Sequence, residues 1–149
     1  MKISDLLKHK GNEVFTIHKD ATAQEVLRKL NGKHVGALIV VNDEGGMEGL
    51  VSERDLLWDL ETCLNCKDTK VTELMTKMKY VIIAHPTEDT EYAMKMFTKN
   101  KIRHLPILEG DKLVGIISIG DVIHSLLDNV EMENKVLKDY MSGSYPIIS

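Results

Sequence analysis

The sequence predicts a mixed α/β fold in which one β-α-β-β-α unit is used twice. Residues 49–55 (GLVSERD) recur as residues 115–121 (GIISIGD), and residues 34–40 (HVGALIV) recur as residues 101–107 (KIRHLPI). The second pair is offset by one residue more than the first, and the extra residue falls in the turn at residues 42–46, where loop length varies freely. A repeat of this size predicts two structural copies, and a site built by one copy is expected in the other.

Length and composition fit one ordinary domain made of two small halves. The chain has 149 residues, of which 43% are hydrophobic, and a net charge of −4. A half of roughly 50–60 residues is marginal alone, so we expect the copies to pack together. Basic residues are interleaved with acidic ones, which argues against nucleic acid as a partner. The apolar run at residues 35–41 is too short to span a bilayer and residues 1–5 lack a signal-peptide pattern, so we predict a cytoplasmic protein.

The first copy shows the expected element signals in order. Residues 14–17 read as a short strand, and a capping box at residues 22–25 opens an amphipathic helix that Asn31 and Gly32 are expected to stop. Residues 37–41 form an apolar strand, joined by a turn to the strand at residues 49–51. A second helix is expected from Ser52.

The second copy repeats this order. The predicted elements are a strand at 80–84, a helix after 86–89, a strand at 104–108, a turn at 109–111, a strand at 113–117 and a helix from Ser118. The predicted segments are a helical start (1–12), the first repeat (13–62), a linker with a short helix at 71–75 (63–77), the second repeat (78–131) and a C-terminal helix at 133–141 with its tail (132–149).

The only two cysteines, Cys63 and Cys66, have C-x-x-C spacing. A thioredoxin-like motif needs its first thiol at a helix N-terminus, and a structural zinc site needs four ligands. Cys63 instead follows a predicted helix and no second pair exists. Incidental thiols are therefore favoured over a thiol-redox or metal site, with the redox function kept as an alternative.

The element order, with a G-h-h-S-x-x-D motif closing each copy, resembles the CBS domain, and the whole chain resembles a stand-alone CBS pair, or Bateman module. The segments GLVSERDLL and RHLPIL…LVGIISIGDV carry the resemblance, which covers about residues 14–130. It implies two CBS repeats related by a pseudo-twofold axis, ligand clefts between them and a homodimer. It also implies an adenosyl ligand such as AMP, ADP, ATP, NAD or S-adenosylmethionine.

The paired serine and aspartate of each motif have two compatible interpretations. Ser118 and Asp121 can form a capping pair at the start of a helix, worth about 1 kcal/mol. The resemblance implies that the Asp121 carboxylate also accepts hydrogen bonds from the ribose hydroxyls, while Ser118 and the helix N-terminus face a phosphate. Ser52 and Asp55 are the equivalent pair in the first copy.

The segment before the second hairpin supplies a second candidate group. The resemblance places Arg103, His104, Leu105 and Pro106 beside the ligand, with the Arg and His contacting phosphate and base. The alternative is a solvent-facing Arg and a packed His. The first copy has no basic residue or proline here, only Gly36, Ala37 and their neighbours, so its cleft is expected to be weaker or differently selective.

Three linker and helix residues are candidate phosphate contacts. Arg54 replaces Gly120 beside the first Ser-x-x-Asp pair, where its guanidinium can grip a phosphate or equally pair with a nearby carboxylate. Lys67 and Thr69 are further candidates.

The resemblance also places residues at the matching strand edges as walls for adenine. These are Thr16, Ile17 and Ala21 in the first copy and Ile82, Ile83, Ala84 and Thr87 in the second. Strand residues of this kind more often serve the core, in which case only their backbone groups matter.

The sequence points to a non-enzymatic regulatory module. The P-loop, nucleophile-elbow and zinc-protease motifs are absent, and the six histidines show no metal-ligand spacing. We predict an adenine nucleotide as ligand, AMP or NAD first, no catalytic cofactor and an unidentified regulated protein as partner. The alternative of another class is a structural dimerisation module with degenerate clefts.

Overall fold

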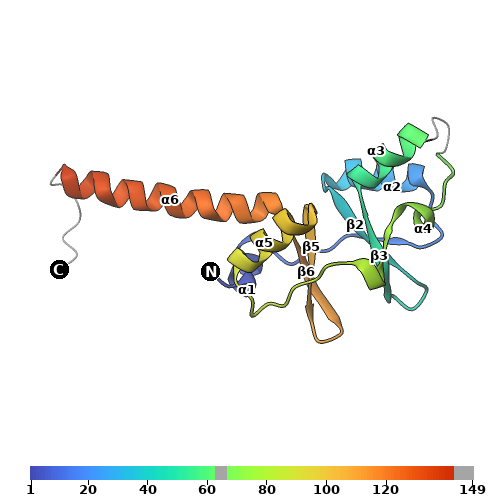
Figure 1. Cartoon of the computed structure of the whole chain (residues 1–149), viewed down its shortest axis with the longest axis horizontal. Coiled ribbons are helices and arrows are strands. Elements are labelled where there is room, and N and C mark those ends of the chain that lie inside the picture. Colours follow the sequence, from blue (N-terminus) through green and yellow to red (C-terminus); the bar gives the residue numbers. More distant parts are fainter. Residues whose placement is uncertain (63–66, 143–149) are drawn as a thin grey trace. The chain divides into compact units, whose positions relative to one another are not determined.

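The computed structural model describes residues 1–62 and 67–142 (Figure 1). They fall into two compact units: unit 1 combines Met1–Asn12 with the chain from Ile83 onward, and unit 2 is Glu13–Ile82. The mixed α/β architecture with two repeat-like units confirms the predicted fold class. Cys63 and Cys66 lie outside the described residues.

Unit 2 is built on a four-stranded sheet in the order β1-β2-β3-β4, with β1 parallel to β2 and the other pairs antiparallel. Its strands are β1 (Thr16–His18), β2 (Ala37–Val41), β3 (Met47–Ser52) and β4 (Thr76–Lys77), and its helices are α2 (Ala23–Lys33), α3 (Glu53–Thr62), α4 (Val71–Leu74) and the 3₁₀ turn η1 (Met78–Tyr80). Apolar residues of β2 and α2 meet in its core, among them Leu38, Val40, Val26 and Leu30.

Helix α2 begins as predicted and ends later than predicted. The Thr22 hydroxyl accepts from the Glu25 N–H at 3.3 Å, and the Glu25 carboxylate accepts from the Thr22 N–H at 3.4 Å, which completes the capping box. The expected stop at Asn31 and Gly32 is wrong, because α2 continues past both to Lys33 and is capped by His34, whose φ of 55° is left-handed. A helix can carry a glycine at a cost of about 1 kcal/mol when its apolar face packs well.

Unit 1 contains the second hairpin, whose pairing reproduces that of the first. Its elements are α1 (Ile3–Lys10), α5 (Thr90–Asn100), β5 (His104–Glu109), β6 (Lys112–Ser118) and α6 (Ile119–Met141). Ser118 pairs with His104 as Ser52 pairs with Ala37, and each hairpin has one register shift at the equivalent place. The duplication inferred from sequence is therefore a duplication of backbone register.

The strand predicted at residues 80–84 is wrong. Within the described residues, this segment forms a single parallel bridge, between Ala84 and Ile107, instead of a strand. In unit 2 the Ile39 N–H donates to the Phe15 carbonyl at 3.0 Å and so extends the parallel pairing. The equivalent of Ile39 is Pro106, which has no N–H to donate. The proline therefore removes the bond that would lengthen this strand.

Helix α6 is longer than predicted. The sequence analysis expected one helix from Ser118 and a separate one at residues 133–141, but α6 runs unbroken from Ile119 to Met141. Residues 121–141 contain neither glycine nor proline, so nothing in this stretch ends the helix. No helix within the described ranges, α6 included, is long and apolar enough to cross a membrane.

Each unit is completed by a short segment that comes, in the sequence, just before the copy of the repeat that forms the other unit. These leader segments, residues 2–7 (KISDLL) and 70–75 (KVTELM), are similar in sequence. The Ile3 N–H donates to the Glu88 carbonyl at 2.8 Å in unit 1, and the Val71 N–H donates to the Ala21 carbonyl at 2.8 Å in unit 2. The leader segment before the first copy thus packs with the second copy, and the leader segment before the second copy packs with the first.

Both leader segments press against a hairpin glycine. A Cβ at Gly49 would overlap the Thr76 carbonyl oxygen and come within 2.8 Å of the Met75 sulfur. A Cβ at Gly115 would come within 2.7 Å of the Leu7 side chain. Glycine is therefore required at this position of each hairpin by the close approach of the leader or the strand after it.

We predict that Gly49→Ala lowers the free energy of unfolding by about 1–3 kcal/mol, because the obstructing Thr76 oxygen belongs to the backbone and cannot rotate away. Gly115→Ala should cost less, since the Leu7 side chain can move. The control is Gly32→Ala in α2, where the space is open and a gain of about 0.5–1 kcal/mol is expected. Urea unfolding of the three variants tests the order, and an unaffected Gly49→Ala would contradict it.

Candidate functional site

The first candidate group lies where β6 becomes α6; we call it the unit 1 junction (Ser118, Asp121, Arg103, His104 and Lys10). The Ser118 N–H donates to Asp121 Oδ2 at 2.8 Å, and the Asp121 N–H donates to Ser118 Oγ at 3.1 Å. These bonds form a complete capping box and hold the half-buried carboxylate in a fixed position.

The Lys10 ammonium joins this junction from α1. Its Nζ lies 3.0 Å from Asp121 Oδ2 and donates to the Ile116 carbonyl at 2.5 Å. Both side chains of the ion pair are 26% exposed. The Ser118 N–H and the ammonium bind the same oxygen, and among the described residues none binds Oδ1. Asp121 is therefore oriented by the protein through Oδ2.

The start of β5 brings two more predicted residues to this junction. The Ile119 N–H donates to the Arg103 carbonyl at 2.9 Å, and His104 pairs with Ser118 across the hairpin. The Arg103 side chain is exposed, whereas His104 is half-buried. Next along β5, Leu105 and Pro106 are buried. The structure thus brings Arg103, His104, Ser118 and Asp121 together, and assigns Leu105 to the core.

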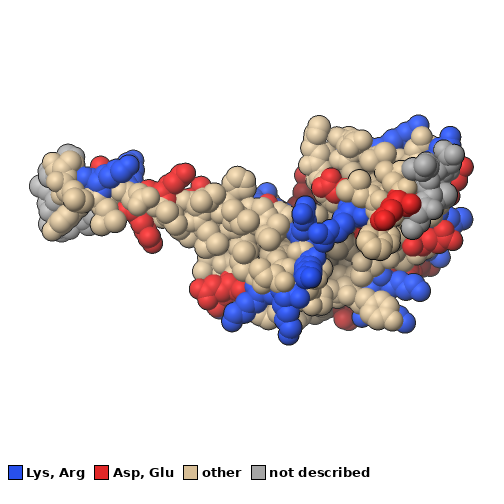
Figure 2. All heavy atoms as spheres, turned by 45° about the horizontal axis from the view of Figure 1, so that its top comes forward, with Lys and Arg blue, Asp and Glu red and all other residues tan. Residues whose placement is uncertain are grey.

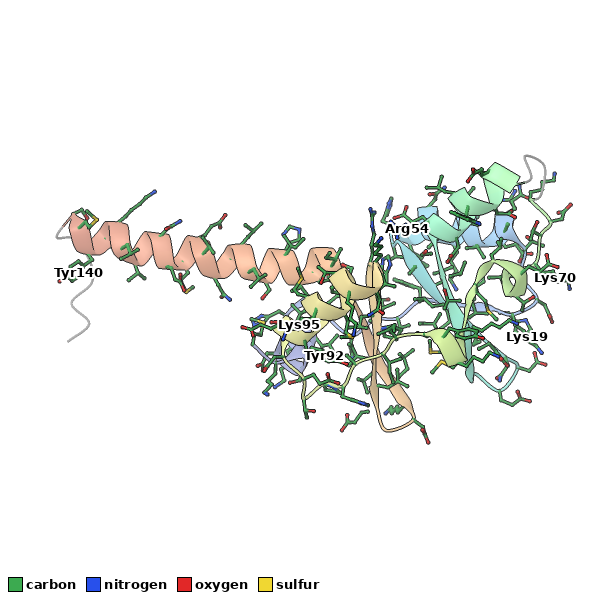
Figure 3. All side chains as sticks on the ribbon, in the orientation of Figure 1. Lys19, Arg54, Lys70, Tyr92, Lys95 and Tyr140 are labelled. Carbon is green, nitrogen blue, oxygen red and sulfur yellow. The ribbon has the colours of Figure 1, made fainter. Side chains whose placement is uncertain are left out.

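The unit 2 junction (Gly36, Ala37, Ser52, Arg54 and Asp55) repeats this geometry between β3 and α3. The Ser52 N–H donates to Asp55 Oδ2 at 2.8 Å and the Ser52 hydroxyl donates to the same oxygen at 3.1 Å. The Glu53 N–H donates to the Gly36 carbonyl at 3.1 Å, as Ile119 does to Arg103, and Ala37 is buried opposite Ser52. Arg54 lies at the start of α3 with an exposed side chain (Figure 3).

The two aspartates differ in their electrostatic surroundings. Burial raises the pKa of the Asp55 carboxyl above its usual value of 3.8, and this outweighs the lowering by the Ser52 hydrogen bonds and the Arg54 charge. The cation at Asp121 is Lys10, whose equivalent after the second leader segment is Met78. One carboxylate therefore has an ammonium bound to it, and the other carries a desolvation cost.

Three of the seven predicted adenine walls are buried in the cores of their units. Ile17, Ala21 and Ala84 are buried, whereas Thr16 and Ile83 are half-buried. Thr87 is exposed. It follows Ala84, which bridges to Ile107, three residues along β5 from His104 and the junction. Ile82 is half-buried and belongs to unit 2. Their role as ligand contacts stays a prediction.

Lys67 and Thr69 are not brought to Asp55. Their carbonyls accept from the Gln24 N–H at 3.0 Å and the Ala23 N–H at 2.8 Å, which fixes them at the start of α2. That helix follows the His18 end of β1, where Val41 ends β2, whereas Asp55 follows the opposite end of the sheet. A five-residue strand separates these ends by roughly 13–17 Å.

Lys10 is the one junction residue that the sequence analysis missed. The sequence signal that could have found it is the similarity of the two leader segments. Residues 8–10 directly follow the first leader segment, which packs on the second hairpin. Within the residues that the structure describes, no group of three or more His, Cys, Asp or Glu side chains could hold a metal ion.

We predict that Asp55→Asn becomes increasingly stabilising as pH rises. A raised folded-state pKa means that ionisation of Asp55 costs stability, so the wild type becomes less stable relative to the variant as pH rises above about 4, where this carboxyl ionises in the unfolded chain. Asparagine keeps an oxygen acceptor for Ser52 but cannot ionise. Denaturant unfolding at several pH values measures the difference, with the exposed Asp128→Asn as control. A difference that does not change with pH would contradict the assignment.

Solved structures of similar chains share this fold. A CBS-domain containing protein from Agrobacterium tumefaciens, ATU1752, superposes with a TM-score of 0.81 at 32% identity, covering 84% of this chain and 98% of that chain. A CBS domain protein from Pyrobaculum aerophilum, solved in complex with AMP, has a TM-score of 0.71 at 24% identity over 81% of this chain and 89% of its own. The CBS domain pair of MJ0100, in complex with 5′-methylthioadenosine and S-adenosyl-L-methionine, has a TM-score of 0.72 at 22% identity, over 87% and 98% of the two chains. The last two support the fold alone.

Sequence comparison identifies the family. A mitochondrial CBS domain-containing protein of Arabidopsis thaliana, CBSX3, is 31% identical over 150 aligned positions, covering 96% of this chain and 73% of the relative. The family model of the CBS domain matches residues 3–61 and 71–128, so each match begins inside a leader segment. The chain belongs to the CBS domain family and carries two copies of the domain.

Proposed function

We propose that this chain is a regulatory module without catalytic activity that binds an adenine nucleotide, AMP or NAD first and ADP or ATP as further candidates, at its two junctions. The observation that carries the proposal is the geometry of Asp121 and Asp55. Each carboxylate is fixed through Oδ2 by its serine, in two copies of the same strand-to-helix turn. Helix capping accounts for these bonds, and the proposal is that the same two half-buried, oriented carboxylates also accept from a ligand.

A carboxylate held in this way suits the vicinal hydroxyls of a ribose. Ionised Asp accepts hydrogen bonds only, on two oxygens, and ribose offers two adjacent O–H donors. Bonds to a charged acceptor contribute about 1.5–3 kcal/mol each. The junction also lies in the first turn of a helix, where the helix dipole favours a phosphate.

The ligands of similar proteins support an adenosyl compound. AMP is bound by the Pyrobaculum aerophilum protein, and S-adenosyl-L-methionine and 5′-methylthioadenosine by the MJ0100 domain pair. These three molecules share adenosine, and the adenosine ribose is the part that Asp121 and Asp55 would bind. Phosphate selectivity would come from the basic residues around each junction.

The two junctions are expected to differ in selectivity. The unit 1 junction offers the exposed Arg103 and the Lys10 ammonium, which favour an anionic ligand. The unit 2 junction has Gly36 where Arg103 stands in its counterpart and offers Arg54 instead, on the helix side. A nucleotide that binds one arrangement of the module better than another shifts its population, and a partner protein would detect that shift.

We predict that Asp121→Asn and Asp55→Asn each weaken AMP binding about tenfold or more at their own junction, and that the double variant removes it, because the amide loses the charge-assisted bonds to ribose. Isothermal titration calorimetry of the full chain with AMP measures both constants. Asp128→Asn, an exposed carboxylate on the same helix as Asp121, is the matched control and should bind as the wild type does.

Unchanged affinity in the double variant would disprove the site assignment. If AMP, NAD, ATP and S-adenosylmethionine all fail to bind or to raise the melting temperature of the wild type, the structural dimerisation module becomes the better interpretation. Mass spectrometry of ligand retained through purification would identify the adenosyl compound.

We predict that Arg103→Met separates phosphate from nucleoside recognition. Losing a guanidinium–phosphate contact should weaken AMP binding about tenfold and leave adenosine binding unchanged. Arg28→Met is the control, because Arg28 is an exposed arginine of α2 in the other unit. Equal loss for AMP and adenosine would show that Arg103 supports the fold of the junction instead of binding phosphate.

A further inference from the structure

The Lys10 ammonium contacts the carboxylate to which the proposed function assigns a ribose. Its Nζ lies 3.0 Å from Asp121 Oδ2, and both side chains are 26% exposed. Figure 2 shows many charged side chains at the surface of the molecule, and the pair of Lys2 with Asp89, also in unit 1, has side chains 56% and 57% exposed. Exposed pairs of that kind contribute little, whereas a pair that is partly shielded from water is stronger. A ligand that binds Asp121 therefore meets a bound cation.

Oδ2 of Asp121 already accepts from two donors. The Ser118 N–H donates to it at 2.8 Å, and the Lys10 ammonium is the second donor. Each carboxylate oxygen offers about two lone-pair sites, so a ribose whose two hydroxyls bind both oxygens needs one of these places. The Ser118 N–H cannot leave without opening the capping box at the start of α6, whereas a lysine side chain can move. Lys10 is therefore the donor that such a ribose would displace.

A second partner keeps the Lys10 ammonium near the junction after it leaves the carboxylate. Nζ also donates to the Ile116 carbonyl at 2.5 Å. Ile116 belongs to β6, two residues before Ser118, where the chain turns into α6. The ammonium can thus stay beside the first turn of α6, which is where the proposed function places a phosphate. The same cation can bind the carboxylate without ligand and the phosphate with it.

At the unit 2 junction the corresponding donor is neutral. The Ser52 N–H and the Ser52 hydroxyl donate to Asp55 Oδ2 at 2.8 Å and 3.1 Å. A hydroxyl hydrogen rotates to suit its partners, so a ribose can take this place without moving a charge. The two junctions therefore differ in the group that a ribose must displace, which is a hydroxyl at Asp55 and an ammonium at Asp121.

We propose that Lys10 is a charge-dependent gate of the unit 1 junction, whose ammonium competes with the ribose for Asp121 and is released by a ligand that offers a phosphate in exchange. A neutral nucleoside separates the ion pair and leaves the ammonium without an anion. An adenine nucleotide brings an anion to it. The junction therefore selects phosphorylated adenosyl ligands over neutral ones such as adenosine. The gate rests on the proposed function and adds to it the class of ligand that the unit 1 junction accepts.

The test compares adenosine with AMP in a chain whose unit 2 junction is inactivated by Asp55→Asn. Lys10→Met keeps the aliphatic part of the side chain and removes the ammonium. It should bind adenosine about tenfold more tightly, because the competitor for Asp121 is gone. AMP affinity should stay within about threefold, because AMP no longer has to separate the ion pair and no longer gains the ammonium contact. Isothermal titration calorimetry measures all four dissociation constants.

Two further variants separate the charge of Lys10 from its packing. Lys10→Arg keeps a cation at this position and should keep adenosine binding weak. Lys8→Met is the matched control, because it removes an exposed cation from the same helix and should leave the affinity for both ligands unchanged. Urea unfolding verifies that each variant is folded.

The outcomes distinguish the gate from the proposed function. If the Asp55→Asn chain binds neither AMP nor adenosine, the proposed function fails at the unit 1 junction and the gate fails with it. If that chain binds AMP, and Lys10→Met weakens AMP while adenosine is unaffected, Lys10 is a phosphate contact like Arg103 and only the gate is disproved. Equal weakening of both ligands would also disprove the gate, because Lys10 would then support the structure of the junction.

Discussion

The turn from the last hairpin strand into its helix controls both candidate sites. At each turn the serine N–H binds the aspartate three residues later, and the next N–H binds the carbonyl of Gly36 or Arg103 at the start of the hairpin. The two ends of the hairpin are thereby tied to the first turn of the helix. The carboxylate cannot move without breaking the helix start, and this would make it a rigid acceptor for the proposed ligand.

Because the leader segments are exchanged, neither copy of the repeat contains all the residues of one compact unit. Residues 2–7 complete the hydrogen bonding of unit 1, and residues 70–75 complete that of unit 2. A cut between the two sequence copies would leave each hairpin glycine without the residue that packs on it. The chain therefore has a duplicated sequence, but each of its compact units contains residues from both copies.

Local features of the fold were predictable from sequence and long-range ones were not. Turn residues and the pattern of apolar residues predicted both hairpins, and the spacing of serine and aspartate predicted the junctions. These features could be predicted because each depends on residues only a few positions apart in the sequence. The lost strand before Ala84 depends on Pro106, which acts on a strand other than its own. Lys10 depends on the packing of α1. Arg103 and His104 were placed with Asp121 only by resemblance, and the hairpin register supplies the physical reason.

The two copies use one backbone with different electrostatics. At the unit 1 junction the Lys10 ammonium lies against the Asp121 carboxylate, so the charge of this acceptor is partly compensated. At the unit 2 junction burial raises the pKa of Asp55, and a ribose that donates to this carboxylate would offset part of its desolvation cost. A ligand bound at Asp55 as proposed would lose its ionised acceptor on acidification, because burial raises the pKa of this carboxyl. Duplication supplies the geometry twice, and single substitutions such as Lys10 or Arg54 then make the sites unequal.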